Sequence, residues 1–375
     1  MEPMDTETIR ARFPVAASYA YFNNAAVGPL SMPAAEAMQA QTEVALRDGV
    51  HGYSGWLDDY AGLRDETAAM LGCSAEEIAI TKNTSEGLCA IANGLDWRSG
   101  DTVVGLSSDF PANYVPWREL QRRRGVRFRS LELRRGRLEL EDLDQACKGA
   151  RLAALSYVHF LTGFRWDLAA VGEICQRHGC LLVLDAVQGM GAFPIDVKAC
   201  GVHALSASGH KWLVGPEGCG VLYVDRELMP QVVPAELGWT SLEGFEEYRH
   251  DGDLQPGARR YECGTLNSVG CAGLRASLAL LNDIGPDFAS RHIDALVNRL
   301  LAGALDKGYE AAAERTSESG SGILSLRKRG ADSGATARAL LEHRVSVAER
   351  MGWIRVAPHV YNSAQEIDRL VELLP

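Results

Sequence analysis

The segment at residues 206–212, with the sequence SASGHKW, contains the lysine whose surroundings most favour chemistry. Lys211 lies among small residues and a histidine, and apolar strand-like stretches flank the segment on both sides. A lysine amine becomes able to form a Schiff base when burial and its neighbours lower its pKa. We therefore predict that Lys211 reaches a buried cofactor, although a simple turn would also explain the segment.

Asp185 ends the apolar stretch LLVLD, where an ionised carboxylate is costly unless a cation pairs with it. A pyridinium cofactor supplies such a cation, because an acidic side chain holds the proton on its ring nitrogen. Gln188, three residues later, is placed to donate a hydrogen bond to an oxygen on the same ring. The alternative for Asp185 is a cap on the segment that follows.

Hydroxyl groups suited to a phosphate occur at two further places. Thr84 and Ser85 follow a predicted strand and begin a predicted helix, and the N-terminus of a helix is a natural anion site. Ser208 and His210, beside the lysine, add two more hydrogen-bond donors. For Thr84 and Ser85 the competing interpretation is an ordinary helix N-cap.

Phe110 follows another predicted strand, at a position where an aromatic side chain could lie flat on a heteroaromatic ring. Structural packing is an equally good local explanation for this residue. Taken together, an aspartate for a ring nitrogen, a lysine for an aldehyde and hydroxyls for a phosphate describe pyridoxal 5′-phosphate. We predict this cofactor, and no metal, at the site.

Alternating strands and helices must position these residues. Polar clusters follow five predicted strands, and in a parallel sheet ligands bind beyond the carboxyl ends of the strands. Continuous apolar strands separated by helices of about ten residues favour a mainly parallel sheet that helices cover on both faces. The predicted strands are 77–81, 102–106, 127–131, 152–158, 181–185, 203–207 and 220–224.

The pattern changes after about residue 285, where helices alternate with short strands at 322–326, 345–347 and 354–356. This predicts an α/β chain with a large cofactor-binding domain at 15–265. A small α+β domain would be formed by 1–14 and 266–375. No Gly/Ser-rich linker separates the two, so we expect them to pack tightly.

The composition is that of a soluble enzyme, with 46% apolar and 23% charged residues among 375. A net charge of −11 argues against nucleic-acid binding, which needs a basic face. Nine cysteines without a CxxC pair are typical of a reducing compartment rather than of a disulfide scaffold. With a polar N-terminus and no run of eighteen apolar residues, a cytoplasmic protein without a membrane span is expected.

The order of these motifs resembles the class V aminotransferases, a family of fold-type I pyridoxal-phosphate enzymes that includes cysteine desulfurases, isopenicillin-N-epimerase-like proteins and kynureninase. The resemblance covers nearly the whole chain. It is carried by TKNTSEG at 81–87, LDAVQG at 184–189, SASGHK at 206–211, YECGTLN at 261–267, and the two ends at 21–29 and 354–362.

The resemblance implies a role for each candidate residue. Lys211 would form the Schiff base and move a proton at the substrate α-carbon, while Asp185 pairs with the ring nitrogen and Gln188 with the phenolic oxygen. Phe110 takes the place of a stacking histidine. Phosphate ligands would be Thr84, Ser85, Ser208 and His210, joined by Thr265 across a homodimer interface, and the substrate would be bound by Arg355 and Asn24.

Two features depart from the family pattern. Desulfurases of this class carry a nucleophilic cysteine on a loop before the arginine at position 355, yet residues 325–354 contain no cysteine. A persulfide-forming desulfurase is therefore not expected. Many relatives also have asparagine at Phe160; here His159 would replace it or act as an acid–base group, unless it is only a packed or capping residue.

The cofactor does not fix the reaction, because transamination, elimination, racemisation and decarboxylation share their early steps. Our first hypothesis is an aminotransferase-type enzyme that acts at the α-carbon of an amino acid. The alternative is a C–S lyase for cysteine conjugates, a C–C lyase or an epimerase in specialised metabolism. A regulator that merely binds the cofactor is a third, non-enzymatic possibility.

Overall fold

A computed structural model describes residues 4–248 and 250–375. At its centre is a seven-stranded sheet in which four of the neighbouring pairs are parallel, and β8 runs antiparallel to both of its neighbours. The strand order is β2 (Ile78–Thr81), β8 (Gly220–Val224), β7 (Ala204–Ser208), β6 (Leu181–Asp185), β5 (Leu152–Ser156), β3 (Thr102–Leu106) and β4 (Arg127–Leu131). The predicted strands and the mainly parallel sheet are therefore confirmed.

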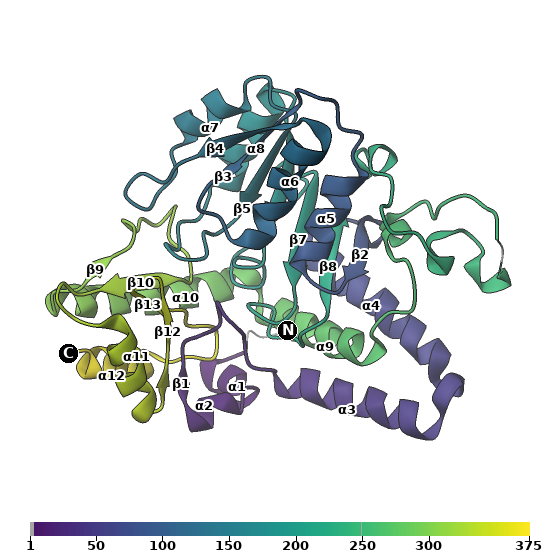
Figure 1. Ribbon diagram of the computed structural model, residues 1–375. Helices are drawn as coiled ribbons and strands as arrows, with labels where there is room; N and C mark the ends of the chain where they lie inside the picture. Colours follow the sequence, from purple (N-terminus) through teal and green to yellow (C-terminus); the bar gives the residue numbers. More distant parts are fainter. Residues whose placement is uncertain (1–3, 249) are drawn as a thin grey trace.

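Helices cover both faces of this sheet (Figure 1). Alternate residues of a strand point to opposite faces, so Leu182 and Leu184 belong to one apolar core and Val183 to the other. The core that contains Val183 also holds residues of α5 (Thr84–Gly94) and α6 (Val115–Arg124). The opposite core holds residues of α4 (Tyr53–Leu71), α7 (Leu140–Cys147), α8 (Leu168–Arg177) and α9 (Ser268–Ile284).

The remaining C-terminal elements form a smaller α+β unit around an antiparallel four-stranded sheet of order β12-β13-β10-β9. Its strands are β9 (Glu310–Ala311), β10 (Leu324–Arg327), β12 (Ala348–Arg350) and β13 (Trp353–Val356). Its helices are α10 (Pro286–Asp306), α11 (Ser333–Glu342) and α12 (Ala364–Leu373). Ile293 and Leu300 of α10 share one apolar core with the large sheet, so the two units pack tightly.

The N-terminal segment joins the two units. It contains α1 (Thr6–Ala11), α2 (Val15–Ser18), β1 (Ala20–Tyr21) and α3 (Met32–Arg47), and β1 pairs in parallel with β11 (Val345–Ser346). The strand β1 at residues 20–21 pairs with a strand of the small unit. The predicted start of the large domain at residue 15 stays a prediction. Among the described residues, no helix combines the length and apolar character that a membrane span requires.

Candidate active site

A cavity of about 460 Å³ lies at the carboxyl ends of the large-sheet strands, facing the small unit. This is the edge where the sequence predicted the polar clusters to meet. Nine of the twelve predicted site residues line it, namely Thr84, Ser85, Phe110, Asp185, Gln188, Ser208, His210, Lys211 and Arg355. The fold therefore brings together residues that are up to 271 positions apart in the chain.

Lys211 follows β7 and extends its amine into this cavity. Its Nζ atom lies 5.3 Å from the centre of the Phe110 ring, at a distance suited to a cation–π contact. The pKa of Lys211 is lowered to about 8, mainly by burial; Asp185 opposes this shift, and the nearby Arg355 and Arg350 contribute to it. A neutral amine, the form that attacks an aldehyde, is therefore accessible near neutral pH.

The pH dependence of cofactor attachment tests the lowered pKa of Lys211. Only the neutral amine reacts, so the rate of covalent attachment of pyridoxal phosphate to cofactor-free protein should rise with pH. We expect a midpoint near the pKa of about 8 rather than near the ordinary lysine value of 10.5. Stopped-flow absorbance between pH 6 and 10 measures it, and a rate still rising tenfold per pH unit above 9 would contradict the lowered pKa.

Asp185 is the buried last residue of β6, and the amide of Val187 donates to its Oδ1 atom at 3.0 Å. Burial raises the pKa of Asp185 to about 7, and the neighbouring Asp109 adds to the effect. In the described part of the chain no lysine or arginine forms an ion pair with this carboxylate. A protonated ring nitrogen would supply the missing cation, so the site fits a pyridinium cofactor.

A hydroxyl-lined anion site lies where α5 meets the end of β7. The amide of Thr84 donates to Ser208 Oγ at 2.8 Å, and the two hydroxyl oxygens are also 2.8 Å apart. Asn83 caps the helix by accepting from the amide of Glu86, and the exposed Ser85 at the second helical position lines the cavity. This arrangement suits a phosphate, because the N-terminal end of a helix carries partial positive charge.

Gln188 is fixed by its two neighbours. Its Nε2 atom donates to the carbonyl of Ala25 at 3.0 Å, and the Trp212 indole donates to its Oε1 atom at 2.8 Å. The amide group is thus held in one orientation beside Asp185 while its second N–H stays available to the cavity.

Two arginines from one hairpin of the small unit complete the cavity wall. Arg355 donates from Nη1 to the carbonyl of Phe160 at 2.9 Å, but its buried Nε atom has no hydrogen-bond partner. Burial, together with the nearby Arg350, lowers the pKa of Arg355 to about 10. A guanidinium with unused donors facing a cavity is suited to binding a carboxylate in bidentate geometry.

Arg350 is the cavity residue that the sequence analysis missed. Ala348 pairs with Arg355 and Arg350 with Trp353, so both arginines project from the same face of the β12–β13 hairpin. The turn between the strands has positive φ at Met351 and Gly352, as a two-residue hairpin requires. A hairpin with this register could have been inferred from the short strands around Met351-Gly352, but the residue facing the cavity could not.

Three predicted residues lie outside the cavity wall. Asn24 is buried, and its amide joins the carbonyl of Ala357 at 2.7 Å to the hydroxyl of Tyr361 at 2.8 Å. These bonds connect the N-terminal segment to the small unit, and the substrate-binding role of Asn24 stays a prediction. Thr265 is exposed beside a separate hollow of about 580 Å³.

His159 is the third of these residues. Its Nε2 atom contacts the carbonyl of Ser108 at 3.1 Å, while Nδ1 accepts from the amide of Thr162 at 3.1 Å. This pattern defines the neutral tautomer with the proton on Nε2, and burial lowers the pKa of His159. With both ring nitrogens occupied, its contacts favour the packing alternative over an acid–base role.

The loop that carries Lys211 is held in place by the N-terminal segment. The amide of Gly28 donates to the carbonyl of His210 at 2.7 Å, and a Cβ atom at Gly28 would lie 2.2 Å from the Lys211 carbonyl oxygen. Val214, in the same loop, has a φ of 45°, a left-handed conformation that costs a β-branched residue about 1–3 kcal/mol.

A methyl group at Gly28 should therefore displace the lysine. We expect Gly28→Ala to lower kcat/KM roughly 100-fold, because a shift of about 1 Å can cost that much. Gly55→Ala is the matched control, since nothing lies within 4 Å of its added Cβ. Steady-state kinetics and the melting temperature of both variants check this, and equal kinetics for the two would show that the close approach does not matter.

The lysine, the unpaired buried carboxylate, the hydroxyl-lined helix terminus and the aromatic wall together fit pyridoxal phosphate. Residues 20–370 match the model of the aminotransferase class-V family, and the chain belongs to this family of pyridoxal-phosphate enzymes. The large and small units are those of the fold-type I enzymes.

Individual proteins similar to this chain agree with the family assignment. The chain is 29% identical to a probable cysteine desulfurase of Pyrococcus abyssi, an alignment that covers 98% of this chain and 96% of the relative. It is 30% identical to the uncharacterized aminotransferase YcbU of Bacillus subtilis, over 98% and 96% of the two chains. Among solved structures, a cysteine desulfurase from Thermococcus onnurineus superposes with a TM-score of 0.92 at 28% identity, covering 100% of this chain and 98% of that one.

Proposed function

We propose that the protein is a pyridoxal-phosphate-dependent C–S lyase that cleaves the Cβ–S bond of an L-cysteine derivative without using a cysteine of its own. The observation that carries this proposal is a combination of two facts. Relatives with near-complete coverage are named cysteine desulfurases, yet residues 325–354 of this chain contain no cysteine. In addition, no sulfur atom of the described residues lines the catalytic cavity.

This proposal replaces the aminotransferase as the favoured activity, because two of the three relatives described above, one of them a solved structure, are named cysteine desulfurases. When bound, pyridoxal phosphate supplies an aldehyde for the substrate amine and a ring that accepts electrons from the α-carbon. The net reaction would convert an S-substituted cysteine and one water into a thiol, pyruvate and ammonium. Every atom is balanced, and neither an oxidant nor a reductant is required.

The residues of the chain would divide this work among them. Arg355 would hold the α-carboxylate of the substrate, and Lys211 would take the α-proton and later deliver it to the leaving group or the carbon skeleton. Asp185 would keep a proton on the ring nitrogen, and Phe110 would cover one face of the ring. Departure of sulfur as a thiol then needs no protein nucleophile.

Arg350 suggests which cysteine derivatives fit. The cavity contains a second guanidinium beyond the one assigned to the α-carboxylate, and Arg350 forms no carboxylate ion pair in the described part of the chain. A substrate with a second acidic group on the far side of its sulfur atom would pair with it. Cystine and carboxyalkyl cysteine conjugates have this chemistry.

Replacing Arg350 should therefore change selectivity more than catalysis. We expect Arg350→Gln to raise KM for L-cystine about 3-fold to 5-fold, which is the upper end of the worth of a solvent-exposed ion pair. The KM for a neutral S-alkyl cysteine and both kcat values should stay within about 2-fold. Equal changes for the acidic and the neutral substrate would argue against a binding site for a second acidic group.

We also propose that Thr265 serves the cavity of a second copy of the chain in a homodimer. Thr265 is exposed and lies outside its own catalytic cavity, next to a hollow that Tyr53, Trp239 and Phe245 line. If its hydroxyl reached the cofactor phosphate bound by a second copy of the chain, both the exposure of Thr265 and its position outside its own cavity would be explained. Thr265→Val should then weaken pyridoxal-phosphate affinity without changing the dimer mass measured by light scattering.

An assay with and without an oxo acid tests the proposed reaction class. Purified holoenzyme would be incubated with L-cystine, S-alkyl cysteines and common amino acids, each with and without 2-oxoglutarate. A C–S lyase releases pyruvate, ammonium and a thiol from the cysteine derivatives in the absence of 2-oxoglutarate. Product formation that strictly requires the oxo acid, with glutamate as co-product, would identify an aminotransferase instead.

A further inference from the structure

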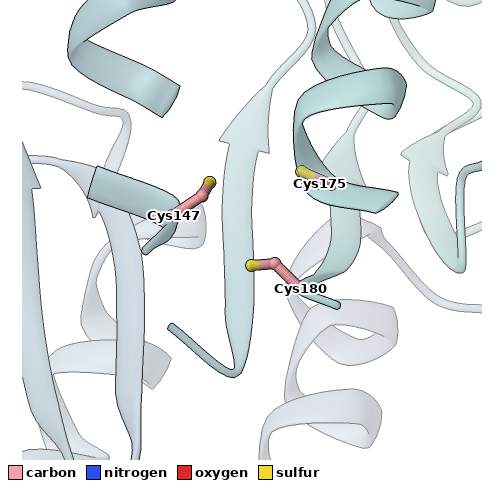
Figure 2. Close-up of side chains that lie close together, drawn as sticks. All are labelled: Cys147, Cys175 and Cys180. Carbon is pink, nitrogen blue, oxygen red and sulfur yellow. The ribbon is translucent and has the colours of Figure 1, made fainter. Parts of the chain in front are cut away.

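Three buried cysteines converge at a place remote from the catalytic cavity. Cys147 ends α7, Cys175 lies in α8 and Cys180 directly precedes β6 (Figure 2). Cys180 precedes β6, and Asp185 is the last residue of this strand. At about 3.3 Å per residue, Cys180 is therefore roughly 16 Å from the cofactor end of the sheet. The proposed C–S chemistry does not use them.

The spacing of the three sulfur atoms suits a single metal ion. All three Sγ atoms lie within 4.8 Å of one another, and the side chains are fully buried or nearly so. Ligands at a Zn–S distance of about 2.3 Å are roughly 3.8 Å apart in a tetrahedral site and roughly 4.0 Å apart in a trigonal one. Small rotations of the side chains would bring all three sulfurs to these separations around one ion.

A metal ion at this position would keep all three cysteines deprotonated, because the thiolate is the form of cysteine that binds metal.

His178 could complete a fourth position. It lies between Cys175 and Cys180 in the sequence, and its Nε2 atom is 3.0 Å from Asp144 Oδ1. A carboxylate on one ring nitrogen leaves the other free and orients the ring, which is the usual arrangement behind a metal-ligating histidine. The ring lies outside the 4.8 Å cluster, so a fourth bond would require it to turn inward.

An access path to the cluster is also present. A groove of about 1030 Å³ on the surface has Cys180 in its wall, together with Gln176 and Gly179 of the segment that carries His178. An ion arriving from solvent would meet Cys180 first.

We propose that Cys147, Cys175 and Cys180 form a binding site for one thiophilic closed-shell metal ion, which joins α7 and α8 to the start of β6. Thiolates favour Zn²⁺ and Cu⁺ alike. Zn²⁺ would recruit His178 as a fourth ligand, whereas Cu⁺ is satisfied by the three sulfurs. Binding releases the thiol protons and changes no oxidation state.

The test is a metal titration of the full-length holoenzyme. Zn²⁺ would be titrated against a chromophoric chelator, and Cu⁺ against a Cu⁺-specific chelator under anaerobic conditions. The variants are Cys175→Ser and Cys147→Ala, and the matched control is Cys271→Ser, whose buried sulfur contacts one other sulfur at 3.9 Å. Normal visible absorbance of the cofactor shows that each variant is folded.

We expect one tightly bound ion in the wild type and in Cys271→Ser, with a melting temperature raised by several degrees. Affinity should fall at least roughly 100-fold in Cys175→Ser and Cys147→Ala, because even the loss of an outer-shell partner costs about 10-fold to 100-fold. A weaker Zn²⁺ but unchanged Cu⁺ affinity in His178→Ala would identify the zinc arrangement, and equal affinities would identify the three-sulfur one.

Three results would overturn the proposal. The first is no stoichiometric binding of either ion, which would make the cluster ordinary apolar packing. The second is equal binding in wild type and Cys175→Ser, which would locate the ion elsewhere. The third is the loss of two free thiols in denatured, air-exposed protein with a mass lower by two hydrogens, which would identify a disulfide pair.

Discussion

Replacing Lys211 with alanine is expected to abolish the covalent attachment of pyridoxal phosphate and to lower turnover by roughly 10⁴-fold or more. The reason is that, in the proposed mechanism, one amine would have two tasks: it would bond to the cofactor, and it would carry the proton at the substrate α-carbon. Its low pKa of about 8 and its position against Phe110 prepare it for both. Borohydride reduction followed by mass spectrometry of the intact protein measures the attachment.

Lys148→Ala is the control for this experiment, because Lys148 is an exposed lysine whose amine donates to the side chain of Gln145. The control should keep one equivalent of reduced cofactor and full activity. If the Lys211 variant also keeps the reduced cofactor on the protein, another amine forms the bond and the assignment fails.

Asp185→Asn should have the second largest effect. Asparagine has the same shape but cannot balance the charge of a protonated ring nitrogen, and breaking a buried ion pair costs about 3–5 kcal/mol. We expect turnover to fall roughly 10²-fold to 10³-fold and the cofactor to dissociate more readily, while covalent attachment through Lys211 persists. Kinetics and equilibrium dialysis of the cofactor measure the two effects.

Asp142→Asn, which alters a surface carboxylate paired with Arg134, is the matched control and should change neither quantity by more than about 2-fold. Near-normal turnover in Asp185→Asn would mean that the ring nitrogen is not protonated by this residue. The raised pKa of Asp185 would then have to reflect burial alone.

The fold and most residues of the candidate cavity could be predicted because the sequence pattern shows where an apolar strand ends and a polar segment follows. Asp185 ends an apolar strand, and Thr84 starts a helix after another strand, so the topology alone brings them to one edge. Such positions depend on local patterns and on the rule for parallel sheets. The structure confirms the strands with shifts of one or two residues at their ends.

Other residues depend on tertiary packing that no local pattern encodes. Arg350 faces the cavity only because of the register of a hairpin in the small unit. His159 meets the carbonyl of Ser108, which is 51 residues away, and that contact decides its tautomer. The bonds of Asn24 reach residues 333 and 337 positions later.

The cysteines illustrate the same limit. Their spacing along the chain lacks a CxxC pair, and the sequence analysis took the cysteines as a sign of a reducing compartment and predicted no metal. Packing α7 against α8 beside the start of β6 brings Cys147 to the other two sulfurs, which lie 28 and 33 positions later in the chain. A ligand set assembled from separate elements is visible only after folding.

The most direct test of the account is the fate of the three-carbon unit of L-cysteine during turnover by holoenzyme, since cleavage of this substrate with one water gives hydrogen sulfide, pyruvate and ammonium. If no protein cysteine takes the sulfur, pyruvate and ammonium should form in equal amounts, and the intact protein mass should show no addition of 32 Da. If a protein cysteine takes the sulfur, the carbon skeleton leaves as alanine and the protein gains that mass. Pyruvate with unmodified protein is the result we predict, and alanine with persulfidated protein would contradict it.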